Sequence, residues 1–366
     1  MTRFCRTALL EPRDPPRARS TPATQWARAL FAGPATALVS LVIMFALGAA
    51  TVGFLKWAIV NAQWTGASAA ACPRDNGACW AFVIARWKPW LVGDYPADQL
   101  WRPFLCFGVF ALFWVWVIYR PRNASMRAVL GGFVGLPIVF AALLLGGIGG
   151  LPFVPPSRLG GLLLTLLVTL CTFATALPAG LMLALGRRSS LLVVRGLCAG
   201  FVESVRAVPL LAVLFIAATL LPMLLPPGNR IDLFTRALVA FALFNAAMAA
   251  EVFRGGLQAI SRGQVEAATT IGLGDFVALR LVVLPQAVTL VVPALVNIMI
   301  AIIKETTVLL VIGVNDLLGA VHGGAKSPDW IGGPNILTSG HVFLALVYLG
   351  ACYGLSRYSR RLESQR

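Results

Sequence analysis

Four consecutive polar residues interrupt one of the most apolar stretches of this sequence. Lys304, Glu305, Thr306 and Thr307 follow the apolar run 287–303. Charged side chains in a membrane segment are costly and usually face protein or water, and transporters place substrate sites where polar residues interrupt a membrane helix. The chemistry that these residue types allow is the binding and passage of a polar solute, along a translocation path or at a gate. The alternative is that they mark only the outer end of a helix.

A second polar pair lies in another apolar stretch. Glu203 and Arg206 are three residues apart, so on a helix they share a face and can form an ion pair. A structural ion pair near the membrane interface and a mechanical role both fit this spacing.

The sequence offers little for covalent or metal chemistry. His322 and His341 are its only histidines, so we expect no metal site, no catalytic residues and no cofactor on this chain. Cys72 and Cys79 flank a short polar loop, where a disulfide is expected in an oxidising compartment and two free thiols are the alternative. The other cysteines in apolar runs are expected to pack as small hydrophobic side chains: Cys106, Cys171, Cys198 and Cys352.

The composition places most of the chain in lipid. Hydrophobic residues make up 58% and charged residues 12%, with a mean hydropathy of +0.82, whereas soluble domains carry roughly a quarter charged residues. Several runs reach the roughly 20 apolar residues that a spanning helix needs, and backbone polar groups in lipid favour helices. We therefore predict an all-α membrane protein with about eight transmembrane helices. The expected segments are 30–60, 104–119, 128–151, 160–185, a span within 191–225, 233–251, 287–303 and 341–355.

The net charge of +16 indicates orientation rather than a nucleic-acid partner. No RNA-binding motif accompanies the basic residues, and lysine and arginine gather in alternate loops, a bias that sets topology. We expect a multi-pass membrane protein, in contact with lipid and with both termini cytoplasmic. The basic, proline-rich residues 1–28 predict a disordered cytoplasmic tail with no evident cleavable signal peptide, and residues 358–366 a second tail.

The loop between the sixth and seventh segments carries the most specific pattern. It reads Glu266, Ala267, Ala268, three residues, Gly272, nine residues, and then Val282, Val283, Leu284 and Pro285. The alanines favour a short helix without bulk, and Glu266 is expected in its first turn, where negative charge suits the helix dipole. Gly272 permits a left-handed backbone, and Pro285 suits the start of the next helix.

This loop resembles the EAA motif of ABC-importer permeases, with Val282 in place of the usual isoleucine. In that family the loop forms a coupling helix that docks on the ATPase subunit. Further matches to the polar-amino-acid branch of binding-protein-dependent permeases are Glu251, Arg254, Gly263 and Gln264, although Arg254 is equally a positively charged anchor at the inner face. Departures from the branch are Ala207 for glycine, Glu305 for aspartate or asparagine, and Met248 for tyrosine.

The resemblance reaches upstream to the M-type permease subunit of the general L-amino-acid importer. It rests on residues 77–82, 95–96, 100–102, 160–166 and 185–189. It implies a heteromeric complex with a second homologous permease, two ABC ATPase subunits that bind ATP and Mg, and a periplasmic binding protein. It also implies a broad range of L-amino acids and alternating access. The sequence lacks a G-x-x-x-x-G-K-[ST] phosphate loop, so the ATPase is expected to be a separate chain.

Pro155 and Pro156 mark a predicted boundary between two membrane parts. Residues 29–156 are expected to form a three-helix extension with a tryptophan-rich outer loop, either a membrane-surface anchor or a docking surface. Residues 157–357 are expected to form the permease domain, with the ABC type I importer core. Two other functions remain: a permease for a single polar amino acid, of the glutamate/glutamine or arginine/histidine type, and an ion-coupled secondary transporter. The latter would need acidic residues deep in several helices, which most apolar runs lack.

Overall fold

The regular elements of the protein are helices. The computed structural model describes residues 28–72, 77–119, 126–147, 149–224, 226 and 231–364, and within these ranges extended backbone pairs only as isolated bridges. Most of the predicted N-terminal tail, and Arg120 and Arg122 of an expected inner loop, lie outside the described residues.

The chain forms two compact units. The first comprises Met1–Ala62 with Asp75–Gly77, and its main element is helix α2 (Pro34–Leu55), which continues through a π-helical turn at Lys56–Val60. Gly33 and Thr36 exchange hydrogen bonds at the start of α2, and Pro34 occupies the first turn, where a missing N–H costs little. No residue of α2 is buried, as expected for a helix surrounded by lipid.

The second unit comprises Gln63–Arg74 and Ala78–Arg366 and contains every other helix that the structure describes. It includes α5 (Trp101–Tyr119) and α6 (Met126–Leu145), which the sequence analysis assigned to a separate extension. Helix α6 packs against α7 (Gly161–Gly186). By internal contacts, therefore, α5 and α6 group with the helices that follow them.

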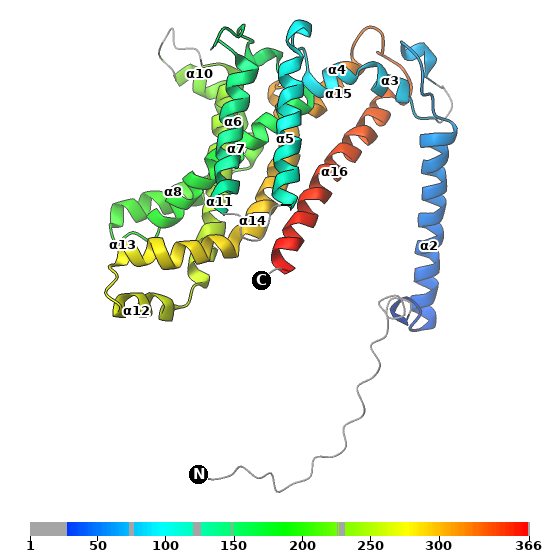
Figure 1. The fold of residues 1–366 in the computed structure, drawn as a ribbon. Coiled ribbons are helices and arrows are strands. Elements are labelled where there is room, and N and C mark those ends of the chain that lie inside the picture. Colours follow the sequence, from blue (N-terminus) through cyan, green and yellow to red (C-terminus); the bar gives the residue numbers. More distant parts are fainter. Residues whose placement is uncertain are drawn as a thin grey trace. The chain divides into compact units, whose positions relative to one another are not determined.

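Helix α7 lies at the centre of this unit (Figure 1). It is apolar on all sides and packs on α6, on α11 (Leu233–Ala259) and on α14 (Leu284–Glu305), which is why it is largely buried. The α7–α11 contact is close because both helices present small residues. A methyl group added at Gly180 would lie 2.7 Å from the Ala249 Cβ and 2.9 Å from the Ala246 oxygen.

The fifth expected membrane segment is a broken helix. Helices α8 (Leu192–Ala207) and α9 (Leu210–Phe215), the latter continued by a π turn and α10 (Leu221–Leu224), meet at an angle of 102°. The break falls at Val208, which has extended backbone angles and precedes Pro209. Proline disfavours a helical conformation in the preceding residue and lacks an N–H, so it ends α8 at this point.

The connection from α11 to α14 is built of short helices. Helix α12 (Arg262–Thr270) is followed by α13 (Asp275–Ala278) and a π turn (Leu279–Val283) that leads into α14. After α14 come a 3-10 helix (Thr306–Ile312), α15 (Leu317–Ala325) and α16 (Ile336–Ser364). Helix α16 therefore continues through most of the predicted C-terminal tail.

The number of spans agrees approximately with the eight expected. Six described helices are long and apolar enough to cross a membrane, the bent pair α8–α9 adds a seventh, and Gly131–Leu145 is a shorter apolar helix. At one end of the second unit lie α15, α3 (Trp80–Ala85) and α4 (Trp87–Val92), whereas α12, α13 and the end of α16 lie at the other (Figure 1).

Candidate functional site

Helix α12 has the rigid, abruptly terminated form that the loop pattern suggests. The Leu273 N–H donates to the Ala268 oxygen at 3.1 Å and the Gly272 N–H to the Thr269 oxygen at 2.9 Å, the two bonds of a Schellman cap. Gly272 has φ +84°, in the left-handed region that favours glycine. Ala268 is buried, whereas Glu266 and Ala267 are exposed. The expectation for Glu266 is wrong in one respect: α12 begins at Arg262, so Glu266 lies beyond the first turn.

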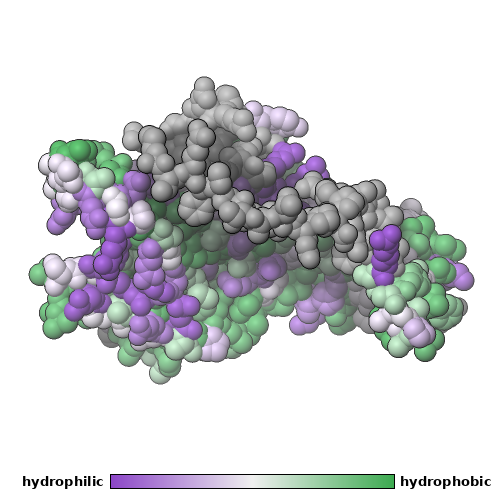
Figure 2. Space-filling model, turned by 90° about the horizontal axis from the view of Figure 1, so that it is seen from below, coloured by the Kyte–Doolittle hydropathy of each residue, from purple (hydrophilic) through white to green (hydrophobic). Residues whose placement is uncertain are grey.

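Two large apolar side chains project from this polar segment. Ile271 is 76% exposed and Phe276 is 73% exposed. Ile271 follows α12 directly, and Phe276 lies in α13. The view from below shows hydrophilic residues gathered on one side of the protein (Figure 2). Apolar side chains among polar ones at a surface are typical of a protein-docking site. The sequence analysis did not single them out, although two large apolar residues in a polar loop were a visible signal.

The remaining loop residues join α12 to the start of α14. The Gln286 amide lies 3.3 Å from the Gln264 side-chain oxygen and also donates to the Val282 oxygen at 2.9 Å. Leu284 packs against the core, Pro285 occupies the first turn of α14, and Gly263 has open space around it.

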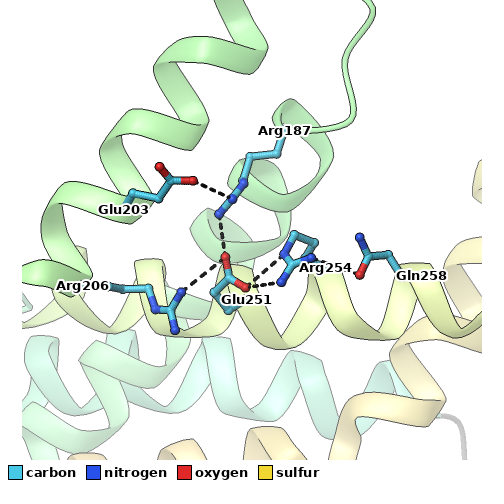
Figure 3. A network of polar contacts seen from close by, with 6 residues as sticks. All are labelled: Arg187, Glu203, Arg206, Glu251, Arg254 and Gln258. Carbon is cyan, nitrogen blue, oxygen red and sulfur yellow. Dashed lines mark hydrogen bonds and ion pairs between the residues drawn. The ribbon is translucent and has the colours of Figure 1, made fainter.

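Glu251 is the centre of a charged network between α11, α8 and the residue that follows α7 (Figure 3). Its carboxylate lies 2.6 Å from Arg187, 3.4 Å from Arg206 and 2.7 Å from Arg254. Arg187 also pairs with Glu203 at 3.1 Å, and Arg254 donates to Gln258 at 3.0 Å. We call Arg187, Glu203, Arg206, Glu251 and Arg254 the charged hub.

The hub corrects the ion pair expected from sequence. Among the ion pairs of the described residues, Glu203 is joined to Arg187 and Arg206 to Glu251, not to each other. Glu203 is 67% exposed at its side chain, whereas Glu251 is 17% exposed and offers the better shielded carboxylate. Arg187, which the sequence analysis did not single out, bridges both carboxylates.

A cavity of about 440 Å³, lined by both polar and apolar side chains, extends from the hub along α11 and α14. Its charged lining residues are Arg206, Glu251 and Glu305, and its amide side chains are Asn245 and Asn297. A cavity that offers both a guanidinium and carboxylates can pair with a solute that carries a negative and a positive group. Asn245 and Asn297 were missed from sequence; each interrupts an apolar helical run, which is the signal that could have found them.

The polar group at the end of α14 divides between different surroundings. Adjacent residues of a helix point in different directions. Of these four residues, Glu305 is the one that lines the cavity. Lys304 is exposed, and the Thr307 hydroxyl donates to the Lys304 oxygen at 2.7 Å. Thr306 is fully buried and its hydroxyl lies 3.4 Å from the Tyr348 hydroxyl, so Thr306 belongs to the packing between the end of α14 and α16.

The opposite end of the unit is closed by an apolar cluster that we call the aromatic cap: Cys72, Cys79, Phe82, Trp90, Trp330 and Phe343. Cys72 and Cys79 are joined by a disulfide. The ring centroids of Phe82 and Trp90 are 5.1 Å apart, and those of Trp90 and Phe343 are 4.9 Å apart. Trp90 is 1% exposed and thus part of a core, whereas Trp64, Trp87 and Trp101 remain about half exposed, as an anchor would.

Asp316 connects this cap to the helices below it. It is fully buried, and its carboxylate accepts from the Gly319 N–H at 2.9 Å as the N-cap of α15. Burial raises the pKa of the Asp316 carboxyl to about 6.

Comparison with known proteins assigns the chain to one class. Residues 176–363 match the model of the family described as "Binding-protein-dependent transport system inner membrane component". The chain is 39% identical over 363 residues, 98% of this chain and 96% of the relative, to the inner membrane amino-acid ABC transporter permease protein YhdY of Escherichia coli K12. It is 33% identical, over 99% of this chain and 98% of the relative, to the glutamate/glutamine/aspartate/asparagine transport system permease protein BztC of Rhodobacter capsulatus. The crystal structure of an amino acid ABC transporter with histidines superposes with a TM-score of 0.51 at 29% identity, covering 56% of this chain and 92% of that one.

Proposed function

Because the chain belongs to the family of binding-protein-dependent transport system inner membrane components, we propose that it is a permease subunit of an ABC importer that carries L-amino acids across the bacterial inner membrane. The observation that supports this proposal most directly is the cavity lined by Arg206 and Glu305 on separate helices. Every free amino acid carries a carboxylate and an ammonium group, whatever its side chain is. Two fixed charges of opposite sign therefore recognise the part that all amino acids share.

We propose that the substrate range is broad. The names of the two full-length relatives describe one as an amino-acid permease and the other as serving four acidic and amide amino acids. Besides the charged groups, the cavity lining consists of the amides Asn245 and Asn297, of Met248 and of small or aliphatic side chains such as Ala301. Such a lining fixes the shared backbone groups and leaves the substrate side chain with few specific partners.

The energy for transport is proposed to come from ATP hydrolysis on two separate ATPase subunits, which bind ATP and Mg. Helix α12, capped by Gly272 and carrying Ile271 and Phe276 beside it, presents the surface on which an ATPase would dock. Movement of α12 would reach α14 through the Gln264–Gln286 contact and the continuous helical segment that begins at α13. In this proposal the chain performs no covalent chemistry and holds no cofactor.

The complete transporter is proposed to contain a second homologous permease and a periplasmic binding protein. The end of the unit with α12 and the last turns of α16 would face the cytoplasm, where the ATPases reside, and the aromatic cap would face the periplasm (Figure 1). We propose, from the distribution of lysine and arginine along the sequence, that both termini are cytoplasmic. A disulfide between Cys72 and Cys79 suits the oxidising periplasm.

Uptake of radiolabelled acidic, neutral and basic L-amino acids tests the proposal in cells that lack this chain. Wild-type protein should restore uptake of all three classes, and restoration of a single amino acid would favour a permease of narrow specificity instead. Gly272→Ala should abolish uptake because φ +84° strains alanine, whereas Gly274→Ala, with φ −67° and open space, is the matched control. Full activity of the Gly272 variant would contradict the coupling role of α12.

A second experiment addresses the translocation path. Glu305→Gln removes the charge proposed to meet the substrate ammonium group, so the KM for uptake should rise by at least about tenfold, the effect of losing a charged hydrogen bond. Thr307→Val is the control, because the Thr307 hydroxyl donates to the Lys304 backbone oxygen and Thr307 is not among the residues that line the cavity. Unchanged kinetics in both variants would remove Glu305 from the path.

A further inference from the structure

An apolar groove of about 260 Å³ lies on the second unit, between α5, α7, α14 and α16. Its floor is buried and formed by Leu170, Met299, Ile303 and Leu355. Its rim, on α16, is exposed. The groove shares no residue with the cavity beside the hub and is therefore separate from the proposed path.

The groove is suited to a hydrocarbon guest. All four helices that form it belong to candidate membrane spans, so its surroundings are lipid rather than water. The lining includes no charged residue. The hydroxyl of Thr169, its one threonine, already donates to the Thr165 oxygen at 2.7 Å.

The rim of the groove is open because two of its positions on α16 are glycines, which have no side chain. Gly350 and Gly354 lie one turn apart on α16, and a methyl group added at either would meet no atom within 4 Å. Glycine in a helix interior costs roughly 1 kcal/mol relative to alanine. Neither glycine is needed for close helix contact within this chain, so both positions leave space that something else can fill.

The end of the groove nearest the C-terminus is amphipathic and basic. Tyr358 lines it, with its ring centroid 5.8 Å from that of Trp114. Arg357 and Arg361 are both exposed. They follow Gly354 by three and seven residues, which places them on the same face of α16 as the groove. Aromatic rings and cations in this order are typical of the level of the lipid headgroups.

We propose that this groove binds one acyl chain of an anionic phospholipid, whose phosphate is held by Arg357 and Arg361. With the orientation proposed above, the lipid belongs to the cytoplasmic leaflet, which carries anionic headgroups. Basic sites between membrane helices on that side are suited to such lipids. A helix of a partner protein is a less suitable occupant, because it would desolvate the exposed Arg357 guanidinium without supplying a phosphate to it.

Photocrosslinking of the full complex in lipid nanodiscs tests the proposal. The probes are phosphatidylglycerol and phosphatidylcholine with the same diazirine in the acyl chain, and mass spectrometry identifies the labelled peptides. We expect phosphatidylglycerol to label residues 110–114 and 350–358 more strongly than phosphatidylcholine. Arg357→Gln together with Arg361→Gln should weaken that preference by about fivefold for each charge and leave the groove intact.

A groove-filling variant provides the second readout. Gly354→Leu should reduce labelling at these peptides to background. Gly108→Leu is the matched control, since Gly108 on α5 also has open space around it and lies outside the groove. Equal labelling of the wild type by the two lipids would overturn the proposal, because it would mean that any acyl chain enters. Crosslinks from the groove to a partner's membrane helix, in place of lipid, would overturn it as well.

Discussion

The charged hub and the aromatic cap hold the two ends of the second unit by different forces. In the hub, Glu251 gathers three arginines from three segments of the chain, and partial exposure keeps these pairs in contact with water. In the cap, Trp90 is buried in the same cluster as a disulfide and makes two aromatic contacts, with Phe82 and Phe343. Ion pairs can exchange partners at a low cost, whereas a covalent bond and close-packed rings cannot.

This difference suggests which end moves in transport. The hub joins α8 to the end of α7 and the last third of α11. Helices α7 and α11 pack closely on each other, whereas the break at Val208 separates α8 from α9, so α8 is the element that we expect to move against the other two. The cap instead fixes α3, α4, α15 and the start of α16 to one another. We expect the hub to rearrange between transport states and the cap to stay intact.

Removal of the central carboxylate should have the largest effect. Glu251→Gln leaves Arg187, Arg206 and Arg254 near one another with Glu203 as the remaining acid. Loss of one partner from a largely buried ion pair destabilises by roughly 3 kcal/mol, less where the arginines are exposed. Thermal unfolding of the purified complex and uptake in cells should both show a large loss. A variant with wild-type melting temperature and uptake would show that the hub holds nothing together.

Loss of the disulfide should be the next largest effect and should act on the cap alone. Cys72→Ser with Cys79→Ser removes a cross-link over a short loop, with an expected cost of about 2 kcal/mol. The melting temperature should fall while the KM for uptake stays constant. Alkylation of both thiols in unreduced wild-type protein, detected by mass spectrometry, would instead show that no disulfide forms in the cell.

A pH dependence should distinguish the cap from the hub. The pKa of Asp316 is about 6 in the folded protein, above the ordinary 3.8, so the folded state binds this proton more tightly than the unfolded state. Its contribution to stability is greatest below pH 4, falls as the pH rises to about 6 and is constant above that. This fall in stability should lower the melting temperature of the wild type by a few degrees between pH 4 and pH 7. Asp316→Asn keeps the N-cap and should remove this pH dependence of the melting temperature. An unchanged pH dependence in this variant would show that Asp316 does not titrate in this range.

The smallest effect should come from the exposed acid of the hub. Glu203 pairs with Arg187 alone and its side chain is 67% exposed, so Glu203→Gln should cost well under 1 kcal/mol. Uptake should remain close to wild type. If Glu203→Gln were as damaging as Glu251→Gln, the hub would be a cooperative unit rather than a network centred on one carboxylate.

Much of the fold could be predicted because lipid restricts what a backbone can do. Long apolar runs such as 160–185 can satisfy their backbone groups only as helices, and α7 has this form. The break at Val208 was harder to predict, since Pro209 permits either a kinked helix or a full change of direction. The 102° bend follows from how α8 and α9 pack, not from local preference.

The local conformation at Gly272 could also be predicted from sequence, whereas the ion-pair partners of Glu203 and Arg206 could not. Gly272 adopts the left-handed conformation because three or four neighbouring residues determine the cap. Glu203 and Arg206 satisfy the spacing rule for an ion pair, yet each finds a partner on another helix. Spacing along one helix shows which residues can meet, but it does not show which partner is better shielded from water.

By itself, the sequence determined the helical membrane fold, the left-handed Gly272 after α12 and the class of transporter, because these depend on local pattern and on the length of apolar runs. Only the tertiary structure decided that Glu251 is the centre of the hub, that Glu305 alone of its polar group reaches the cavity and that Trp90 lies in a core. Those outcomes depend on which surfaces of segments distant in the sequence pack together. A side chain becomes buried, and a charge becomes shielded from water, only when such segments are in contact.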